Sequence, residues 1–234
     1  MQQGQRGSCW LNNYLDRGQT VKAVVRSSDK VAESIREHPG LFLIEANVLE
    51  LTDEELAGHV TGCTAVASCL GHNLTFRGMF GSPRRLVKEA TSRLCDAVKA
   101  SPSKEPVKFV LMNTTGNRNR DLEEPISFAQ RCVIGLLRLL LPPHADNEEA
   151  ADYLRTTIGR DDKVIEWVVV RPDGLVNQEA VSLYESHASP IRSAIFDAGK
   201  TSRINVGYFM AELITDSDLW HKWKGQMPVI YNNE

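Results

Sequence analysis

The first 26 residues, MQQGQRGSCWLNNYLDRGQTVKAVVR, decide how the rest of the chain is interpreted. Gly4 and Gly7 precede a helical stretch over residues 8–17, a turn at Gly18 and a β-branched run over residues 21–25. Glycines just before a helix let the backbone approach a phosphate group, whose charge meets the first N–H groups of that helix. The order predicts a dinucleotide-binding unit that begins after its first strand, since that strand would precede Met1.

Apolar runs alternate with helical patterns along the rest of the chain. This alternation predicts βαβ units and a doubly wound parallel sheet of the α/β class, Rossmann-like and N-terminally truncated. We expect a single domain over residues 1–234, in which residues 176–234 contribute a small C-terminal substrate lobe. The expected strands are residues 21–25, 41–44, 63–70, 108–112, 167–171 and 229–231, and the expected helices are 29–37, 52–58, 83–100, 126–141, 147–158 and 206–215.

Composition excludes several classes of function. The net charge is −3 and the basic residues are scattered, so a nucleic-acid partner is not expected. The longest apolar run, near residues 133–141, is too short to span a bilayer, so no membrane partner is expected. Five cysteines without a CxxC pair indicate reduced thiols in a cytoplasmic protein. His144, Asp146, Glu148 and Glu149 cluster at a helix start, where acidic residues suit the helix dipole, and we assign no metal site.

Polar and small residues follow each apolar run, where a doubly wound sheet binds its ligands. The five segments that follow the runs are Arg26-Ser27-Ser28, Asn47-Val48, Ser68-Cys69-Leu70-Gly71, Asn113-Thr114-Thr115-Gly116 and Arg171-Pro172-Asp173-Gly174-Leu175. The five segments in this order indicate a ligand-binding site more specifically than any one segment alone.

This set resembles the atypical short-chain dehydrogenases/reductases, in particular the NmrA-like NAD(P)-binding proteins. The family's GxxGxxG loop, Arg-Gly turn and VxAxVR strand match Gly4, Gly7, Arg17-Gly18 and Val21–Arg26, with the first loop glycine replaced by Met1. The resemblance implies NAD(P) binding along the strand ends. The residues implied to bind the cofactor are Gly4, Gly7, Arg26, Ser27, Asn47, Val48, Cys69, Leu70, Gly71, Thr114, Pro172, Gly174 and Leu175.

Arg26 bears on the choice of cofactor. It ends the strand at the place where an acidic residue would bind the ribose 2′-hydroxyl of NAD. A guanidinium group with neighbouring serines instead favours the 2′-phosphate, so NADP(H) is expected rather than NAD(H).

The catalytic residues are less apparent. None of the five tyrosines has a lysine four residues later, so the family's usual YxxxK pair is missing. Tyr153 lies in the segment where that tyrosine is expected, and Thr115 where the family often has a substrate-orienting serine, so these are the candidates.

Three functions remain open. The chain is an oxidoreductase on an unknown small-molecule substrate, a non-catalytic NADP(H)-sensing regulator with a protein partner, or a truncated form with impaired cofactor binding.

Overall fold

The computed structural model describes residues 11–72, 75, 81–124 and 127–233. Gly4 and Gly7, the expected phosphate-loop glycines, lie outside these residues. None of the helices in the described ranges is long and apolar enough to cross a membrane.

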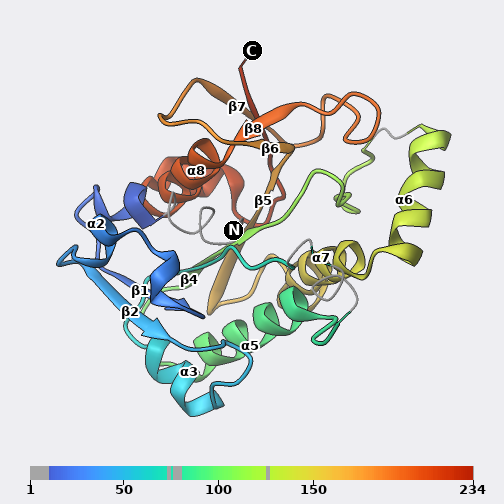
Figure 1. The fold of residues 1–234 in the computed structure, drawn as a ribbon. Coiled ribbons are helices and arrows are strands. Elements are labelled where there is room, and N and C mark those ends of the chain that lie inside the picture. The colour runs from blue at the N-terminus through green and yellow to red at the C-terminus, as the bar shows by residue number, and fades with distance from the viewer. Residues whose placement is uncertain (1–10, 73–74, 76–80, 125–126, 234) are drawn as a thin grey trace.

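The described strands form one five-stranded sheet and two two-stranded sheets (Figure 1). The larger sheet has the order β3-β4-β5-β9-β7, and its neighbours run parallel except for β7, which is antiparallel to β9. β1 pairs with β2, and β6 with β8, both in parallel. The bounds are β1 Val21–Val25, β2 Leu41–Glu45, β3 Ala65–Ser68, β4 Val107–Met112, β5 Ile165–Pro172, β6 Gly174–Val176, β7 Tyr184–His187, β8 Lys200–Ser202 and β9 Val229–Asn232.

Helices connect these strands and cover the main sheet. Residues 11–15 are helical as well. The bounds are η1 Ser28–Lys30, α2 Glu33–Arg36, α3 Asp53–Val60, α5 Leu86–Ala100, α6 Phe128–Leu140, α7 Pro142–Tyr153, the π-helical turn η2 Leu154–Ile158, α8 Arg203–Thr215 and α9 Ser217–Trp223.

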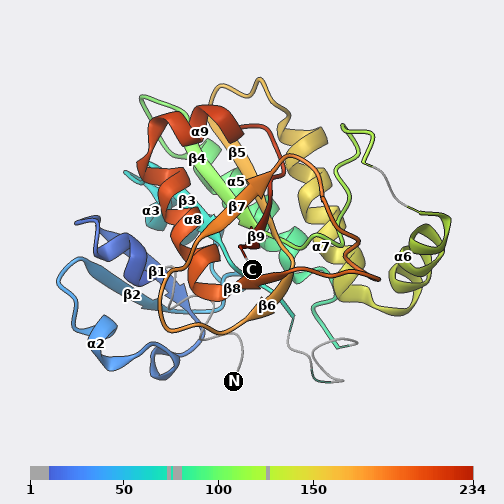
Figure 2. The same cartoon turned by 90° about the horizontal axis from the view of Figure 1, so that it is seen from above.

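The central strands β4 and β5 are buried on both faces. Successive strand residues point to opposite faces, so alternate β4 residues enter different cores. Phe109 and Leu111 pack with residues of α3, α5 and α7, whereas Val110 and Met112 pack with residues of α8 and α9. Figure 2 shows the two helix layers on either side of β4 and β5. Such coverage explains why these strands are almost entirely apolar.

The expected parallel sheet is confirmed in its central part but is divided at β1. In Figure 2, β1 lies between β2 and β3. Among the described residues no strand joins β1 to β3, and the two belong to different sheets. Both nevertheless contribute to one apolar core, because Ala23 and Val25 of β1 and Ala65 and Ala67 of β3 pack against the same buried cluster.

The capping box expected at Thr52 is confirmed, with Thr52 and Glu55 exchanging side-chain and backbone hydrogen bonds at the start of α3. Two helix boundaries differ from expectation. Residues 29–37 form the short η1 and α2 rather than one helix. α7 begins at Pro142 rather than near residue 147, because proline is tolerated in a helix's first turn.

The segment expected to form a C-terminal lobe is built into the main body. α8 packs on the central sheet, and β9 extends that sheet beside β5. The strands β6, β7 and β8 and the helix α9 within it were not predicted.

Candidate functional site

The ends of β4 and β5 are joined by hydrogen bonds that position Thr115. The Thr115 N–H donates to the Pro172 carbonyl at 3.1 Å. Its hydroxyl donates to Oδ1 of Asp173 at 3.1 Å, and both side chains are buried. Thr114 accepts a 3.3 Å hydrogen bond at Oγ1 from the Gly116 N–H. The structure thus brings Thr114, Thr115 and Pro172 together at the carboxyl edge of the sheet.

Asp173 organises the turn after β5. Its carboxylate also accepts hydrogen bonds from the N–H groups of Gly174 and Gly199, each at 2.9 Å. Burial raises the pKa of Asp173, although the hydrogen bonds from Gly199, Thr115 and Gly174 partly offset the effect. The Thr115 hydroxyl therefore donates its hydrogen bond to Asp173, and in this conformation Thr115 positions the turn after β5.

Gly199 lies against an aromatic ring. A Cβ atom at Gly199 would come within 2.6 Å of Cδ1 of Tyr231, which no real contact allows. Gly199 and Tyr231 border a cavity of about 320 Å³, whose charged lining residues are Glu185, Arg192 and Lys200. That volume is in the range of small-molecule pockets.

Arg171 is a structural residue that sequence reasoning left without a role. Its side chain is fully buried, and Nη2 lies 2.7 Å from Oε1 of buried Glu124. Nε donates to the Met227 carbonyl at 2.7 Å, and Nη1 to the Asn117 carbonyl at 2.9 Å. Arg171 thereby fixes the loop after β4 and the approach to β9. An arginine inside an otherwise apolar run is the sequence signal for such a buried partner.

The residues after β3 meet those of β6 and α8. Cys69 and Leu175 line one small cavity together with Met112 and Arg203. The buried Oγ of Ser68, at the end of β3, has no hydrogen-bond partner among the described residues. Gly71 follows Leu70, which packs against the core beside α5. The predicted cofactor residues of this segment therefore lie beside those that follow β5.

The residues after β1 and β2 form a second, more open group. Arg26 is exposed at the end of β1, and Ser27 is the N-cap of η1. The Ser28 N–H donates to Oε2 of Glu45 at 3.2 Å, which places one carboxylate beside this group.

Asn47 and Val48, after β2, are engaged in the fold. The Asn47 amide donates to Oε1 of Glu50 at 2.8 Å and its oxygen accepts from the Leu49 N–H. Val48 is buried, and its carbonyl accepts a 3.0 Å hydrogen bond from Arg93. Both residues shape the turn that follows β2.

The structure does not bring the two catalytic candidates together. Tyr153 ends α7, with the ammonium of Lys88 on α5 5.7 Å from its ring, and burial raises the pKa of its phenol. The part of α7 that reaches the strand ends is Asn147, whose carbonyl accepts from Asn113 at 2.8 Å. Tyr153 is six residues further on, about 9 Å along the helix axis. Thr115 and Tyr153 share no described contact.

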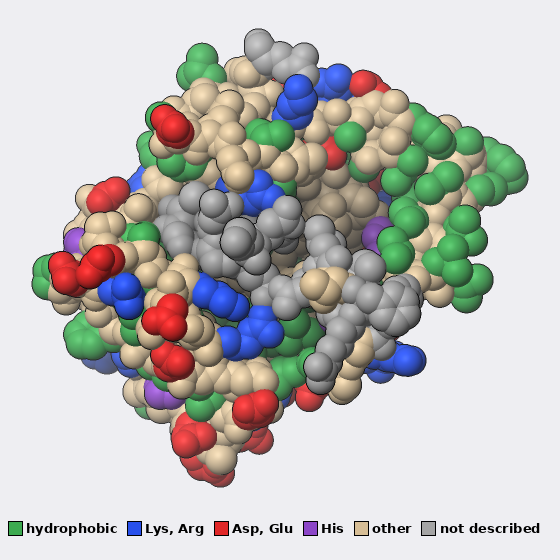
Figure 3. Space-filling view, in the orientation of Figure 1, with side chains coloured by type: hydrophobic (Ala, Val, Ile, Leu, Met, Phe, Trp, Pro, Cys, Tyr) green, Lys and Arg blue, Asp and Glu red, His purple; other side chains and the backbone are tan. Residues whose placement is uncertain are grey.

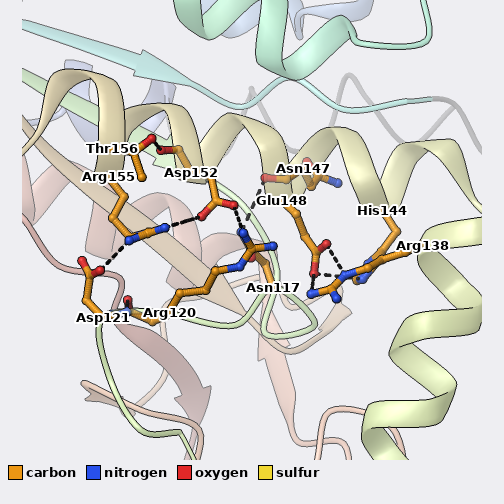
Figure 4. Close-up of polar contacts among 11 residues, drawn as sticks. Asn117, Arg120, Asp121, Arg138, His144, Asn147, Glu148, Asp152, Arg155 and Thr156 are labelled. Atoms are coloured by element: carbon orange, nitrogen blue, oxygen red, sulfur yellow. Dashed lines mark hydrogen bonds and ion pairs between the residues drawn. The ribbon is translucent and has the colours of Figure 1, made fainter.

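A different pair on α7 lies beside the end of β4. His144 and Glu148 face one another four residues apart, with 3.5 Å between Nε2 and Oε1, and Arg138 bonds to Glu148 (Figure 4). The His144 ring also contacts Gly116, since a Cβ there would lie 3.4 Å from its Cε1. Burial opposes ionisation of Glu148, but the nearby His144 and the hydrogen bonds from Arg138 outweigh it and lower the pKa of the carboxyl. In the sequence, His144 and Glu148 stand out only as charged residues near a helix start.

The described residues fit a dinucleotide in part. Successive strand ends carry groups that suit such a ligand. They are the cation of Arg26 after β1, the Ser68 hydroxyl at the end of β3, which has no hydrogen-bond partner among the described residues, and the close-packed Gly174 and Gly199 at the turn after β5. Arg26 and Ser27 would meet the adenosine end, and Thr114, Pro172 and Gly174 the other end.

Comparison with known proteins decides the family. The NAD(P)H-binding family's sequence profile matches residues 3–217. The chain belongs to the NAD(P)H-binding family. No curated protein sequence matches the chain significantly.

Solved structures show the same fold for this NAD(P)H-binding protein. The oxidoreductase YlbE from Lactococcus lactis is 16% identical, with a TM-score of 0.68 over 99% of this chain and 88% of its own. ChuY, an anaerobilin reductase from Escherichia coli O157:H7, is 15% identical, with a TM-score of 0.66 over 98% and 92%. A short-chain dehydrogenase/reductase from Veillonella parvula in complex with NADP is 14% identical, with a TM-score of 0.65 over 98% and 91%.

Proposed function

We propose that this NAD(P)H-binding protein is a cytoplasmic oxidoreductase of the atypical short-chain type that prefers NADP(H) and acts on a small carbonyl compound. The family match over residues 3–217 supports cofactor binding. Neighbours of the same fold include an oxidoreductase, a reductase and a protein bound to NADP, which supports the reaction class.

The position of Arg26 is the observation that carries the cofactor preference. Its exposed side chain follows β1, beside Ser27 and Ser28. A guanidinium group can hold a phosphate with two parallel hydrogen bonds, whereas NADH offers only a neutral 2′-hydroxyl there. Glu45 accepts a hydrogen bond from the Ser28 N–H at the same place, so Arg26 supplies the positive charge at these strand ends and Glu45 a negative one.

Titration calorimetry tests the preference. Arg26→Ala is expected to raise the Kd for NADPH about 10–100-fold, because hydrogen bonds to charged groups contribute about 1.5–3 kcal/mol. The Kd for NADH should change little. The matched control is Arg36→Ala, which removes an exposed guanidinium from α2. Equal loss of NADPH and NADH binding in Arg26→Ala would contradict the assignment.

His144 is our candidate for the proton donor. The bound cofactor supplies the hydride, and the substrate oxygen must gain a proton as the carbonyl becomes an alcohol. The His144 ring lies beside Gly116 at the end of β4, with its Nε2 3.5 Å from Oε1 of Glu148. The spacing of four residues is that of the YxxxK pair, which the sequence lacks.

NADPH oxidation across a panel of small carbonyl compounds tests this role. His144→Ala should lower kcat by about 10²–10⁴ while the Kd for NADPH stays constant. His221→Ala, which removes an exposed imidazole on α9, is the control. Full activity of His144→Ala would exclude His144 as the proton donor. Loss of activity in Thr115→Val or Tyr153→Phe would instead assign a catalytic role to the residue changed, as the sequence predicts.

A redox sensor is the second candidate function. The commitment of the Thr115 hydroxyl to Asp173 and the packing of Tyr153 on α5 favour it, because they leave His144 as the single candidate proton donor described here. A sensor binds NADPH tightly, oxidises none of the panel and passes its state to a protein partner. Tight binding of NADPH over NADP without turnover would select this function.

We also propose that β1 and β3 flank a position for one further strand. Each is paired on one edge only within the described residues, and the apolar residues of both, apart from buried Val21, are only half-buried. A strand placed between them would join the two sheets. Cofactor binding is expected to be weak whenever this position is empty, which is the third function left open by the sequence.

A further inference from the structure

Helix α6 is the least buried long helix that the structure describes. In Figures 1 and 2 it stands at one side of the molecule, beside α7. Only Gln130 and Ile134 are buried in it. Its exposed large apolar side chains are Phe128, Leu136, Leu139 and Leu140, and they form the hydrophobic surface over α6 in Figure 3.

The solvent-facing side of α6 has the residue spacing of a helix–helix seam. Phe128, Cys132, Gly135 and Leu139 follow one another at intervals of four, three and four residues, and all four are exposed. This is the heptad spacing of a coiled coil. The side that faces the protein carries Gln130 and Ile134, so the seam is separate from the helix's own packing. A Cβ at Gly135 would meet open space, which leaves room for another helix to approach.

A neighbouring segment contacts α6 on the side opposite the seam. The Ser193 hydroxyl donates to Oε1 of Gln130 at 3.1 Å and so ties residues 191–196 to α6. Ile191 and Phe196 on that segment are 57% and 61% exposed. The four exposed apolar side chains of α6 alone present on the order of 500 Å² of apolar surface. A stable interface buries about 800 Å² per partner, so these side chains would supply the apolar centre of a dimer contact and the polar residues around them the rest.

The charges of α6 favour a second copy over a lipid surface. Membrane-surface helices carry many Lys and Arg residues on their polar face. α6 carries only Arg131 and Arg138, and Arg138 forms two hydrogen bonds to Glu148. With Arg138 bonded to Glu148, α6 offers fewer cations to phospholipid head groups than a membrane-surface helix does.

We propose that α6 pairs antiparallel with α6 of a second copy of this chain. A twofold axis between Cys132 and Gly135 sets Phe128 opposite Leu139 and Cys132 opposite Gly135, so that every position of the seam meets a complementary one. The small residues Cys132 and Gly135 at the centre let the two backbones approach closely. The large Phe128 and Leu139 pack against one another at both ends of the contact. Such self-complementarity is what a contact between identical surfaces requires.

Sedimentation velocity of the full chain at about 1–100 µM tests the proposal. The wild type should reach twice its 26.1 kDa mass, and Leu139→Glu should weaken the dimer at least about 100-fold. Leu183→Glu is the matched control, because Leu139 and Leu183 are both 79% exposed and Leu183 lies outside α6. It should dimerise like the wild type. Unchanged circular dichroism would show that Leu139→Glu is folded.

A cross-link tests the register. Gly135→Cys places a thiol opposite Cys132 of the other copy, and mild oxidation should give a disulfide-linked dimer that Leu139→Glu prevents. A wild type that stays at 26.1 kDa at 100 µM overturns the proposal. Monomers that bind vesicles of phosphatidylserine and phosphatidylcholine through Leu139 would also overturn it, in favour of a membrane surface.

Discussion

The two central strands and the β1–β2 pair are built from similar residues but have different surroundings. Five of six residues in β4 and seven of eight in β5 are buried, whereas one of five is buried in β1 and one of five in β2. β4 has a strand on both sides, and β1 has one among the described residues. The central strands therefore provide most of the stability, while the open pair carries Arg26, the residue proposed to select the cofactor.

The largest expected effect concerns the ion pair at the end of β5. Arg171→Met leaves the Glu124 carboxylate buried without its partner and should cost about 3–5 kcal/mol of unfolding free energy, measured in urea. The exposed pair of Arg85 with Glu149 is the control, and Arg85→Ala should cost less than about 1 kcal/mol. A loss below about 1 kcal/mol in Arg171→Met would mean that the central strands do not depend on this contact.

A smaller effect on the free energy of unfolding should distinguish the central strands β4 and β5 from the β1–β2 pair. Val169→Ala in β5 removes two buried methyl groups and should cost about 2–3 kcal/mol, because a cavity remains. The same change at Val24 of β1, which is only half-buried, should cost less than about 1 kcal/mol. Both losses come from urea unfolding curves. Equal losses would show that the second edge of β1 is covered after all.

The smallest expected effect comes from supplying a strand. A five-residue Val- and Ile-rich strand with a glycine-containing loop, fused ahead of the chain, should raise Tm by about 2–8 °C. About 1–2 kcal/mol of added ladder and burial produces such a shift in a domain of this size. The Kd for NADPH should fall in parallel. A Gly/Ser segment of equal length is the control, and an unchanged Tm with the apolar strand would contradict a free position beside β1.

Much of the fold could be predicted because its signals are local. The β-branched and apolar runs locate β1, β2, β4 and β5 to within one or two residues, and the Thr52–Glu55 capping box marks α3. Parallel strands end on one edge, so the segments after them could be assigned to one site. Cys69 and Leu175 do meet around one cavity, and Thr115 does meet the turn after β5.

The rest depends on contacts between distant residues. No local pattern shows that Asp173 would accept the Thr115 hydroxyl or that Glu124 would pair with Arg171. The start of α7 at Pro142 moves His144 into the helix and opposite Glu148, which a boundary near residue 147 conceals. Half-buried and fully buried strands also have the same apolar composition, because neighbouring strands rather than propensity decide how much of each is covered.

The contact of Gly199 with Tyr231 has a consequence for the evolution of this chain. Because a Cβ at Gly199 would come within 2.6 Å of the Tyr231 ring, the two positions cannot vary independently. A relative that carries alanine at the first position is expected to carry a smaller side chain at the second. Paired replacement at these two positions, 32 residues apart in sequence, would trace the wall of the cavity through the family without a structure of any other member.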